Sequence, residues 1–170
     1  MADGFTIDEK SFGFTIDEKS FGTLPQRIQA LGERLANLDP ILKRRAALLG
    51  SVIDESFRAS RSPNGAGWQA LAASTVEKRR QGSSKPLLDT GALRQASNAQ
   101  VRSKAIVFGT SGAPAKYGVF HVTGTSTMPR RAYLPMDEDG NPDFSSGPAA
   151  AWLEKTRADV IAYVIHGTRP

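Results

Sequence analysis

The sequence predicts an α+β fold, in which a small, mostly antiparallel sheet is flanked by N-terminal amphipathic helices and a C-terminal helix. Three observations support this prediction. Apolar residues recur at helical spacing over residues 24–37 and 40–57. A run over residues 100–109 alternates with the period of a strand. Strands and helices do not alternate as they do in a parallel nucleotide-binding sheet. We therefore expect a single domain over residues 23–170, preceded by an arm at residues 1–22.

The composition is that of a folded protein with a modest positive charge. Of the 170 residues, 39% are hydrophobic and 23% are charged, and the formal net charge is +5. This charge favours attraction to polyanions but does not define a binding site. The absence of cysteine excludes disulfides and thiolate metal sites, and it favours a reducing compartment. No apolar run approaches the ~18 residues of a membrane-spanning helix, so we expect no membrane contact.

The arm contains a perfect tandem repeat, because residues 4–12 and 13–21 both read GFTIDEKSF. Within each copy, Phe and Ile are two residues apart and would share one face of an extended strand. Two copies are too few to build a solenoid. In one interpretation the arm adds as a strand to a neighbouring subunit, with Phe5 and Ile7 as contacts. In the other, the repeat is a duplication without a role of its own.

The helices are predicted from apolar spacing and from the residues that end each one. The pair Asp39-Pro40 separates the first two helices, because a residue before proline is pushed out of the helical region. Further helices are expected over residues 69–81, as a short turn around Leu93, and from Pro148 to the stop at Gly167.

Further strand predictions concern the chain after residue 109. Residues 131–136 are expected to form a second strand, followed by a loop or hairpin tip over residues 137–147. Residues 117–122 are short and apolar, and their pattern fits a strand or a helix equally well.

The sequence contains no pattern typical of a catalytic or metal site. Its two histidines, His121 and His166, lack the spacing of metal ligands. The acidic run at residues 137–143 does not match a calcium loop, which needs glycine at its sixth position and glutamate at its twelfth. There is no Gly-rich phosphate loop and no nucleophile motif. We expect no cofactor, no metal and no enzymatic activity.

Short motifs follow one another in a fixed order through residues 57–134. They are Phe57, Pro63, Gly65, Trp68, Leu71 and Thr75; Leu88-Asp89-Thr90-Gly91 with Leu93-Arg94; residues 107–109; Tyr117, His121 and Gly124; and Met128-Pro129 with Arg131, Tyr133 and Leu134. Taken together, this ordered set resembles the phage virion morphogenesis family, the Mu-like tail completion or tail terminator proteins of contractile-tailed phages. The chain departs from the family pattern at Val122-Thr123, after the histidine, and at Arg130 and Ala132, in the proline–arginine motif.

The resemblance implies a structural virion protein that forms a closed ring, commonly a hexamer, at the head-proximal end of the tail. Such a ring caps the tail tube and sheath, joins head–neck connector proteins and surrounds a lumen through which DNA passes. The expected location is the virion neck, and the host cytoplasm during assembly. The residues expected at subunit or partner contacts are Phe5, Ile7, Tyr117, His121, Arg131 and Tyr133.

Two alternatives remain open from the sequence. One is a connector on the head side of the neck. The other is a small basic nucleic-acid-binding protein, which the clusters Lys43-Arg44-Arg45 and Lys78-Arg79-Arg80 would support. For the ring, we expect Arg131→Glu and Tyr133→Ala to impair assembly more than folding.

Overall fold

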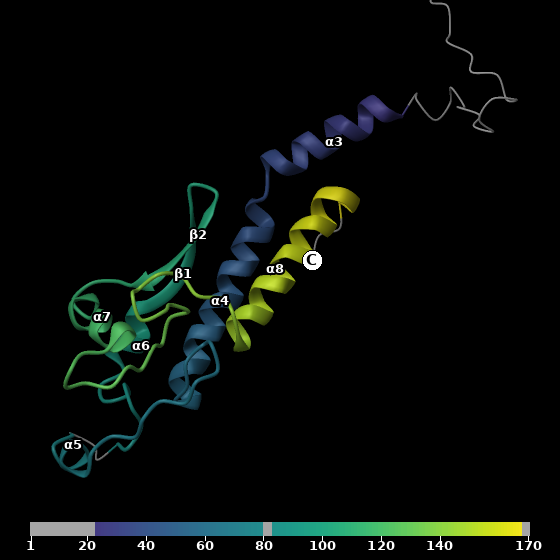
Figure 1. Ribbon diagram of the computed structural model, residues 1–170. Helices are drawn as coiled ribbons and strands as arrows, with labels where there is room; N and C mark the ends of the chain where they lie inside the picture. The colour runs from purple at the N-terminus through teal and green to yellow at the C-terminus, as the bar shows by residue number, and fades with distance from the viewer. Residues whose placement is uncertain (1–22, 80–82, 168–170) are drawn as a thin grey trace, which may run out of the picture. The chain divides into compact units, whose positions relative to one another are not determined.

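The computed structural model describes residues 23–79 and 83–167. The chain divides into two compact units, Met1–Asn37 and Leu38–Pro170, which are described separately below. Figure 1 shows the course of the chain. The predicted arm, with its contacts Phe5 and Ile7, lies outside the described residues. The predicted boundary between arm and domain therefore stays a prediction.

The described part of the first unit is helix α3, Leu24–Ala36. Pro25 lies in its first turn, where a missing N–H costs nothing, and Asn37 ends the helix. The helix predicted over residues 24–37 is thus confirmed. No residue of α3 is buried, and its apolar stripe is open, with Ile28 60% exposed.

The second unit is built on two long helices, α4 (Asp39–Ala59) and α8 (Gly147–His166). Helix α4 turns a stripe that includes Ile41, Leu49, Ile53 and Phe57 toward the interior. Helix α8 ends at Gly167, whose φ of 69° is the left-handed conformation common after a helix. Both helices were predicted with nearly these bounds, because their apolar positions follow the helical period.

Three contacts tie α8 to the N-terminal half of α4. The indole Nε1 of Trp152 donates to the carbonyl of Arg45 at 2.9 Å. The Arg45 guanidinium forms an ion pair with Asp159 and donates to the carbonyl of Lys155 at 3.0 Å. Because Arg45 is only 6% exposed, the basic cluster at residues 43–45 does not present three free cations to solvent.

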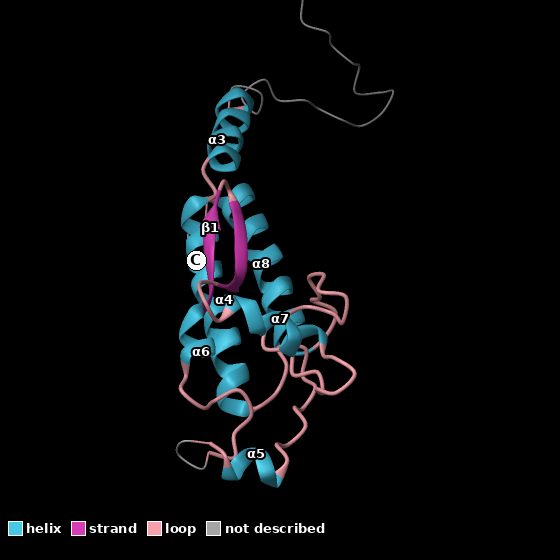
Figure 2. Ribbon diagram, turned by 90° about the vertical axis from the view of Figure 1, so that its left-hand side faces the viewer, coloured by secondary structure: helices cyan, strands magenta, loops and turns pink. Residues whose placement is uncertain are grey.

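The sheet is a hairpin of β1 (Ser97–Arg102) and β2 (Ala105–Thr110), paired antiparallel with Ser97 opposite Thr110. It contacts α4 and faces the viewer in Figure 2. The α+β prediction is confirmed, but the single strand expected over residues 100–109 is wrong. The chain reverses at Ser103 and Lys104, which have φ of 49° and 61°. Hairpin turns of this kind usually carry Gly or Asn, and neither residue marks a turn at this position.

Three short helices complete the unit: α5 (Ala73–Glu77), α6 (Ala92–Ala96) and α7 (Ala115–Thr123). Helix α6 was predicted, and α7 resolves the ambiguity over residues 117–122 in favour of a helix. Helix α5 is much shorter than the predicted 69–81. The carbonyls of Gln69 and Ala70 accept bonds from the Arg131 side chain instead of from a following helical turn, and Ala72 is extended.

Residues 131–135 are buried throughout but do not form the predicted strand. Their polar groups bond to side chains and loops rather than to a neighbouring strand. Trp68 Nε1 donates to the carbonyl of Ala132 at 3.0 Å, and the carbonyl of Pro135 accepts from the Asp143 N–H at 2.9 Å. Residues 131–135 therefore form a buried segment without regular secondary structure, which we call the strut.

Tyr133, on this strut, lies at the centre of the core and is 1% exposed. Its ring is 5.2 Å from that of Phe57, and its hydroxyl is 2.7 Å from Thr110 Oγ1. Thr110 Oγ1 is 3.0 Å from Ser97 Oγ, which donates to the carbonyl of Leu93 at 2.7 Å. Because the Ser97 hydroxyl donates its one proton to that carbonyl, it can only accept from Thr110. Thr110 in turn accepts from the Tyr133 hydroxyl. This hydroxyl chain joins the strut, the base of the hairpin and the end of α6.

Gly118 on α7 is packed against the same hydroxyl. A Cβ at position 118 would overlap Tyr133 Oη and lie 3.2 Å from Leu93 Cδ1. We expect Gly118→Ala to lower the free energy of unfolding by about 1–3 kcal/mol, because an overpacked core must shift. Denaturant unfolding would measure the loss.

Gly50→Ala is the matched control, because its Cβ would meet nothing within 4 Å in the middle of α4. This change should stabilise by about 0.5–1 kcal/mol, the usual gain of alanine over glycine in a helix. When Tyr133→Phe has removed the hydroxyl, adding Gly118→Ala should lower the free energy of unfolding by less than it does in the wild type. Equal losses with and without the hydroxyl would contradict the proposed clash.

Candidate functional site

A pocket of about 560 Å³ lies beside α7 and brings together Tyr117, His121 and Arg131, three of the six predicted contact residues. Its walls come from the extended residues 69–72, the turn at residues 87–93, α7 and the loop at residues 127–131. The lining comprises Gln69, Ala70, Leu71, Ala72, Thr75, Arg79, Leu87, Asp89, Thr90, Gly91, Ala92, Leu93, Tyr117, His121, Thr127, Met128, Pro129 and Arg131.

Arg131 builds one wall of the pocket. Its Nε donates to the carbonyl of Gln69 at 2.9 Å and its Nη2 to that of Ala70 at 3.1 Å. Its backbone N–H donates to the carbonyl of His121 at 2.8 Å. Arg131 thus fastens the extended residues 69–72 to the end of α7, and its guanidinium borders the pocket.

Arg79 builds the opposite wall in a similar way. The carbonyls of Ser83, Lys85 and Leu88 all lie within hydrogen-bond distance of its Nη1, at 3.2, 2.6 and 3.3 Å. In the loop that this side chain holds, Leu87 has a φ of 60°. Such a backbone is costly for a branched side chain and persists only where the surroundings enforce it. The loop therefore presents Leu87 to the pocket in a fixed position.

The pocket combines apolar walls with positive charge. Burial, and then the charge of Arg79, lowers the pKa of Arg131, although the Arg131 guanidinium stays charged near neutral pH. Burial, and then the Arg131 guanidinium, lowers the pKa of His121, so this imidazole is neutral there. Its Nδ1 is buried with no hydrogen-bond partner among the described residues. The ring stands edge-on to Tyr117, with centroids 6.3 Å apart.

The structure gives the predicted contact residues unequal access to a partner. Tyr117 is 43% exposed, whereas Arg131 is 7% and Tyr133 is 1% exposed. A role for Arg131 and Tyr133 in subunit contacts stays a prediction, but neither offers much surface of its own. That Tyr133→Ala and Arg131→Glu impair assembly more than folding also stays a prediction. Because the Tyr133 ring lies in the core and Arg131 donates to two carbonyls, we expect both changes to destabilise the protomer as well.

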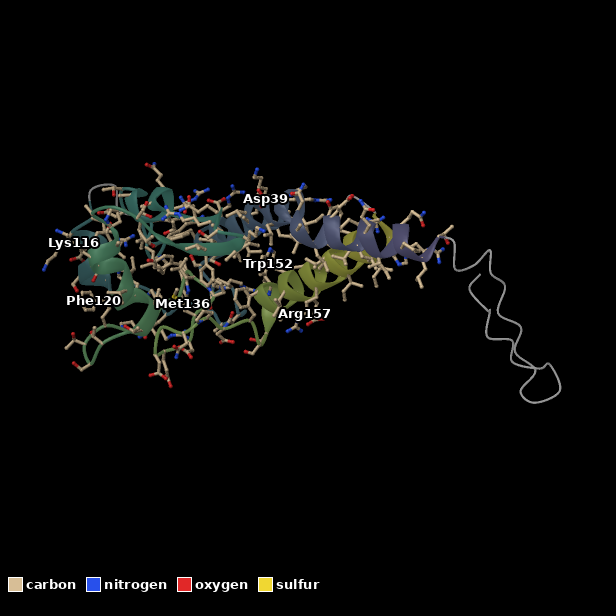
Figure 3. All side chains as sticks on the ribbon, turned by 90° about the horizontal axis from the view of Figure 1, so that it is seen from above. Asp39, Lys116, Phe120, Met136, Trp152 and Arg157 are labelled. Carbon is tan, nitrogen blue, oxygen red and sulfur yellow. The ribbon has the colours of Figure 1, made fainter. Side chains whose placement is uncertain are left out.

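The outward side of α7 carries apolar surface that the sequence analysis did not identify as a contact. Val119 is 50% and Phe120 49% exposed, while Gly118 and Val122 on the same helix are buried. Figure 3 shows Phe120 and Lys116 at the outer edge of the second unit. Once residues 117–122 are read as a helix, the helical period places Val119 and Phe120 away from the buried pair. In a strand, Val119 and Phe120 would instead point to opposite faces.

Within residues 23–79 and 83–167, no group of three or more His, Asp or Glu side chains is placed to hold a metal ion. None of the described helices is long and apolar enough to span a bilayer.

The neutral, partly buried His121 makes stability depend on pH. Its folded pKa is below the ordinary value of about 6.5, so the unfolded chain binds the proton more readily. The free energy of unfolding should therefore fall as pH drops below about 6.5, with a slope no steeper than about 1.4 kcal/mol per pH unit, the limit for one proton. Denaturant unfolding between pH 8 and pH 5 would measure it.

His121→Gln should flatten this part of the pH profile, because glutamine does not titrate. His166→Gln is the matched control, since this exposed histidine lies at the end of α8 and outside the pocket. A slope that survives His121→Gln and disappears with His166→Gln would contradict the assignment.

Comparison with known proteins assigns the chain to a family. A model of the phage virion morphogenesis family matches residues 20–158, which run from before α3 to the second half of α8 and include the whole pocket. Comparisons with curated proteins and with solved structures give no match. The family resemblance inferred from the motifs is thereby confirmed. The chain belongs to the phage virion morphogenesis family, whose members take part in building the virus particle.

Proposed function

We propose that this protein is a tail completion or tail terminator protein that assembles into a closed ring, with six subunits as the first expectation. The ring would sit at the head-proximal end of the tail, cap the tube and sheath, bind head–neck connector proteins and leave a lumen for DNA. Family membership supports a structural role in virion assembly. The ring and its position are our proposal.

The observation that carries this proposal is the apolar outer surface of α7. Val119 and Phe120 are half exposed on a helix whose other side is fixed in the core by Gly118 and Val122. Exposed apolar patches on a rigid element mark sites of protein association, and aromatic residues are enriched at interface centres. The part of the protomer that the structure describes leaves this surface uncovered.

A second apolar surface lies on α8, where Ile161 is 56% exposed. Figure 1 shows α7 and α8 on opposite sides of the hairpin within the second unit. A ring needs a contact in which two different surfaces of neighbouring subunits meet, since two identical surfaces would close into a dimer. Two separate apolar patches on one unit are compatible with such a contact.

Each of the two basic clusters that suggested nucleic-acid binding has one arginine that is engaged within the protein. Arg45 pairs with Asp159, and Arg79 donates to loop carbonyls. Arg94 and Arg58 both pair with Asp54. Arginines bound in this way contribute less to a polyanion contact than free ones, so the structure does not favour this alternative.

The proposal is tested by the mass of the assembly in solution. Sedimentation velocity or native mass spectrometry should find a closed oligomer at micromolar concentration. Phe120→Asp should weaken association at least about tenfold, because it places a carboxylate in an apolar contact. Lys116→Asp, which adds the same carboxylate to an exposed position on α7, should have a smaller effect.

Electron microscopy of virions carrying a labelled copy of the protein would then locate it. Label at the junction of tail and neck is expected, whereas label on the head side would favour a connector. A monomer at high concentration that is absent from the neck would contradict the proposed function.

A further inference from the structure

We infer that the pocket beside α7 binds the N-terminal arm of a second copy of this chain, through the repeated segment GFTIDEKSF at residues 4–21. The inference concerns a surface that the proposed function leaves without a partner. Its intermolecular part rests on the proposed self-association. The arguments come from the chemistry of the pocket, from the composition of the arm and from the length of chain outside the described residues.

The pocket is built in advance of any ligand. Hydrogen bonds from the side chains of Arg131 and Arg79 to backbone carbonyls fix two of its walls, and Leu87 is held in place by the loop around Arg79. Leu71, Leu87 and Met128 supply apolar lining. Its volume of about 560 Å³ is typical of sites that take several side-chain-sized groups.

The charge of the pocket restricts the kind of occupant. Arg79 and Arg131 both border it, and Arg79 lies near enough to depress the pKa of Arg131. Across residues 23–79 and 83–167, neither guanidinium has a carboxylate within ion-pair distance, although Asp89 lines the rim. A ligand that inserts apolar side chains and brings carboxylates close to the two guanidiniums would match both features.

Each copy of the arm segment has this composition. Phe14 and Ile16 are two residues apart and fall on one side of an extended chain, and Asp17-Glu18 follow directly. The other acidic stretch, at residues 137–143, lacks such an apolar pair. There the Asp137 carboxylate is already used, because it accepts from the N–H groups of Asp139 and Asn141 within its own turn.

The arm is long enough to reach another subunit. The 22 residues before Thr23 would span up to about 70 Å if extended. An extended segment that docks on a neighbour links consecutive subunits in one direction, as a ring requires. Two copies of the segment in one arm also raise the local concentration of the ligand at the pocket.

Photo-crosslinking in the full chain tests the inference. A benzophenone side chain replaces Phe14, or Phe5 in a second preparation, and unlabelled chains are mixed with ¹⁵N-labelled chains. Mass spectrometry should find crosslinks from the arm to residues 69–72 and 127–131 that join labelled to unlabelled chains. Crosslinks confined to other surfaces, or to chains of one label, would overturn the inference.

Variants then test the chemistry of the contact. Replacing Asp8, Glu9, Asp17 and Glu18 by Lys leaves the pocket intact and should lower the crosslink yield at least about tenfold, because like charges would meet. Tyr117→Ala, in the lining, should also lower the yield. Val107→Ala is the matched control, since Val107 is 44% exposed but lies on β2, outside the lining. An unchanged yield after charge reversal would contradict the electrostatic match.

Sedimentation of the same samples separates this inference from the proposed function. A closed oligomer without crosslinks in the pocket would reject the arm contact and leave the ring standing. A wild-type chain that stays monomeric would reject the ring, and the intermolecular contact with it.

Discussion

The hydrogen bond from the hydroxyl of Tyr133 to Thr110 connects parts of the second unit that the backbone leaves separate. Ser97 continues this chain of hydroxyl groups to the carbonyl of Leu93. Successive hydrogen bonds therefore join the irregular strut, the hairpin base and α6. The same hydroxyl sets how closely α7 approaches, because Gly118 lies against it. A two-stranded hairpin alone offers too little pairing to fix these elements. Burial raises the pKa of Tyr133, so the hydroxyl stays protonated and able to donate.

Arginine side chains take over the role that strand pairing has in larger sheets. Arg131 holds the extended residues before α5, Arg79 holds the loop after it, and Arg130 donates through Nε to the carbonyl of Val122 at 2.8 Å. Each guanidinium carries several donors in a rigid plane and satisfies carbonyls that no regular element satisfies. Part of the positive charge of the sequence therefore serves the interior of the unit, and Arg79 and Arg131 also line the pocket.

The sequence was sufficient where local periodicity decides the structure. The spacing of apolar residues in α3, α4 and α8 predicted three helices with nearly their observed bounds. Local spacing did not predict the structure where a residue distant in the sequence decides it. Arg131 binds a carbonyl that would otherwise accept from a longer α5 helix. The strut accepts a hydrogen bond from Trp68 instead of pairing with a strand. The hairpin was missed because its turn uses Ser103 and Lys104. The grouping of Tyr117, His121 and Arg131 in one pocket was not visible in the sequence, since it depends on these long-range bonds.

The turn of the hairpin has a practical consequence. Ser103 and Lys104 are exposed, and neither belongs to the core, the pocket or the apolar surface of α7. Their left-handed backbone also suits glycine and asparagine, which are common at the ends of inserted tags. A peptide epitope placed here would project from the second unit on a stem of paired strands. It would mark the position of the protein in an image of the virus particle.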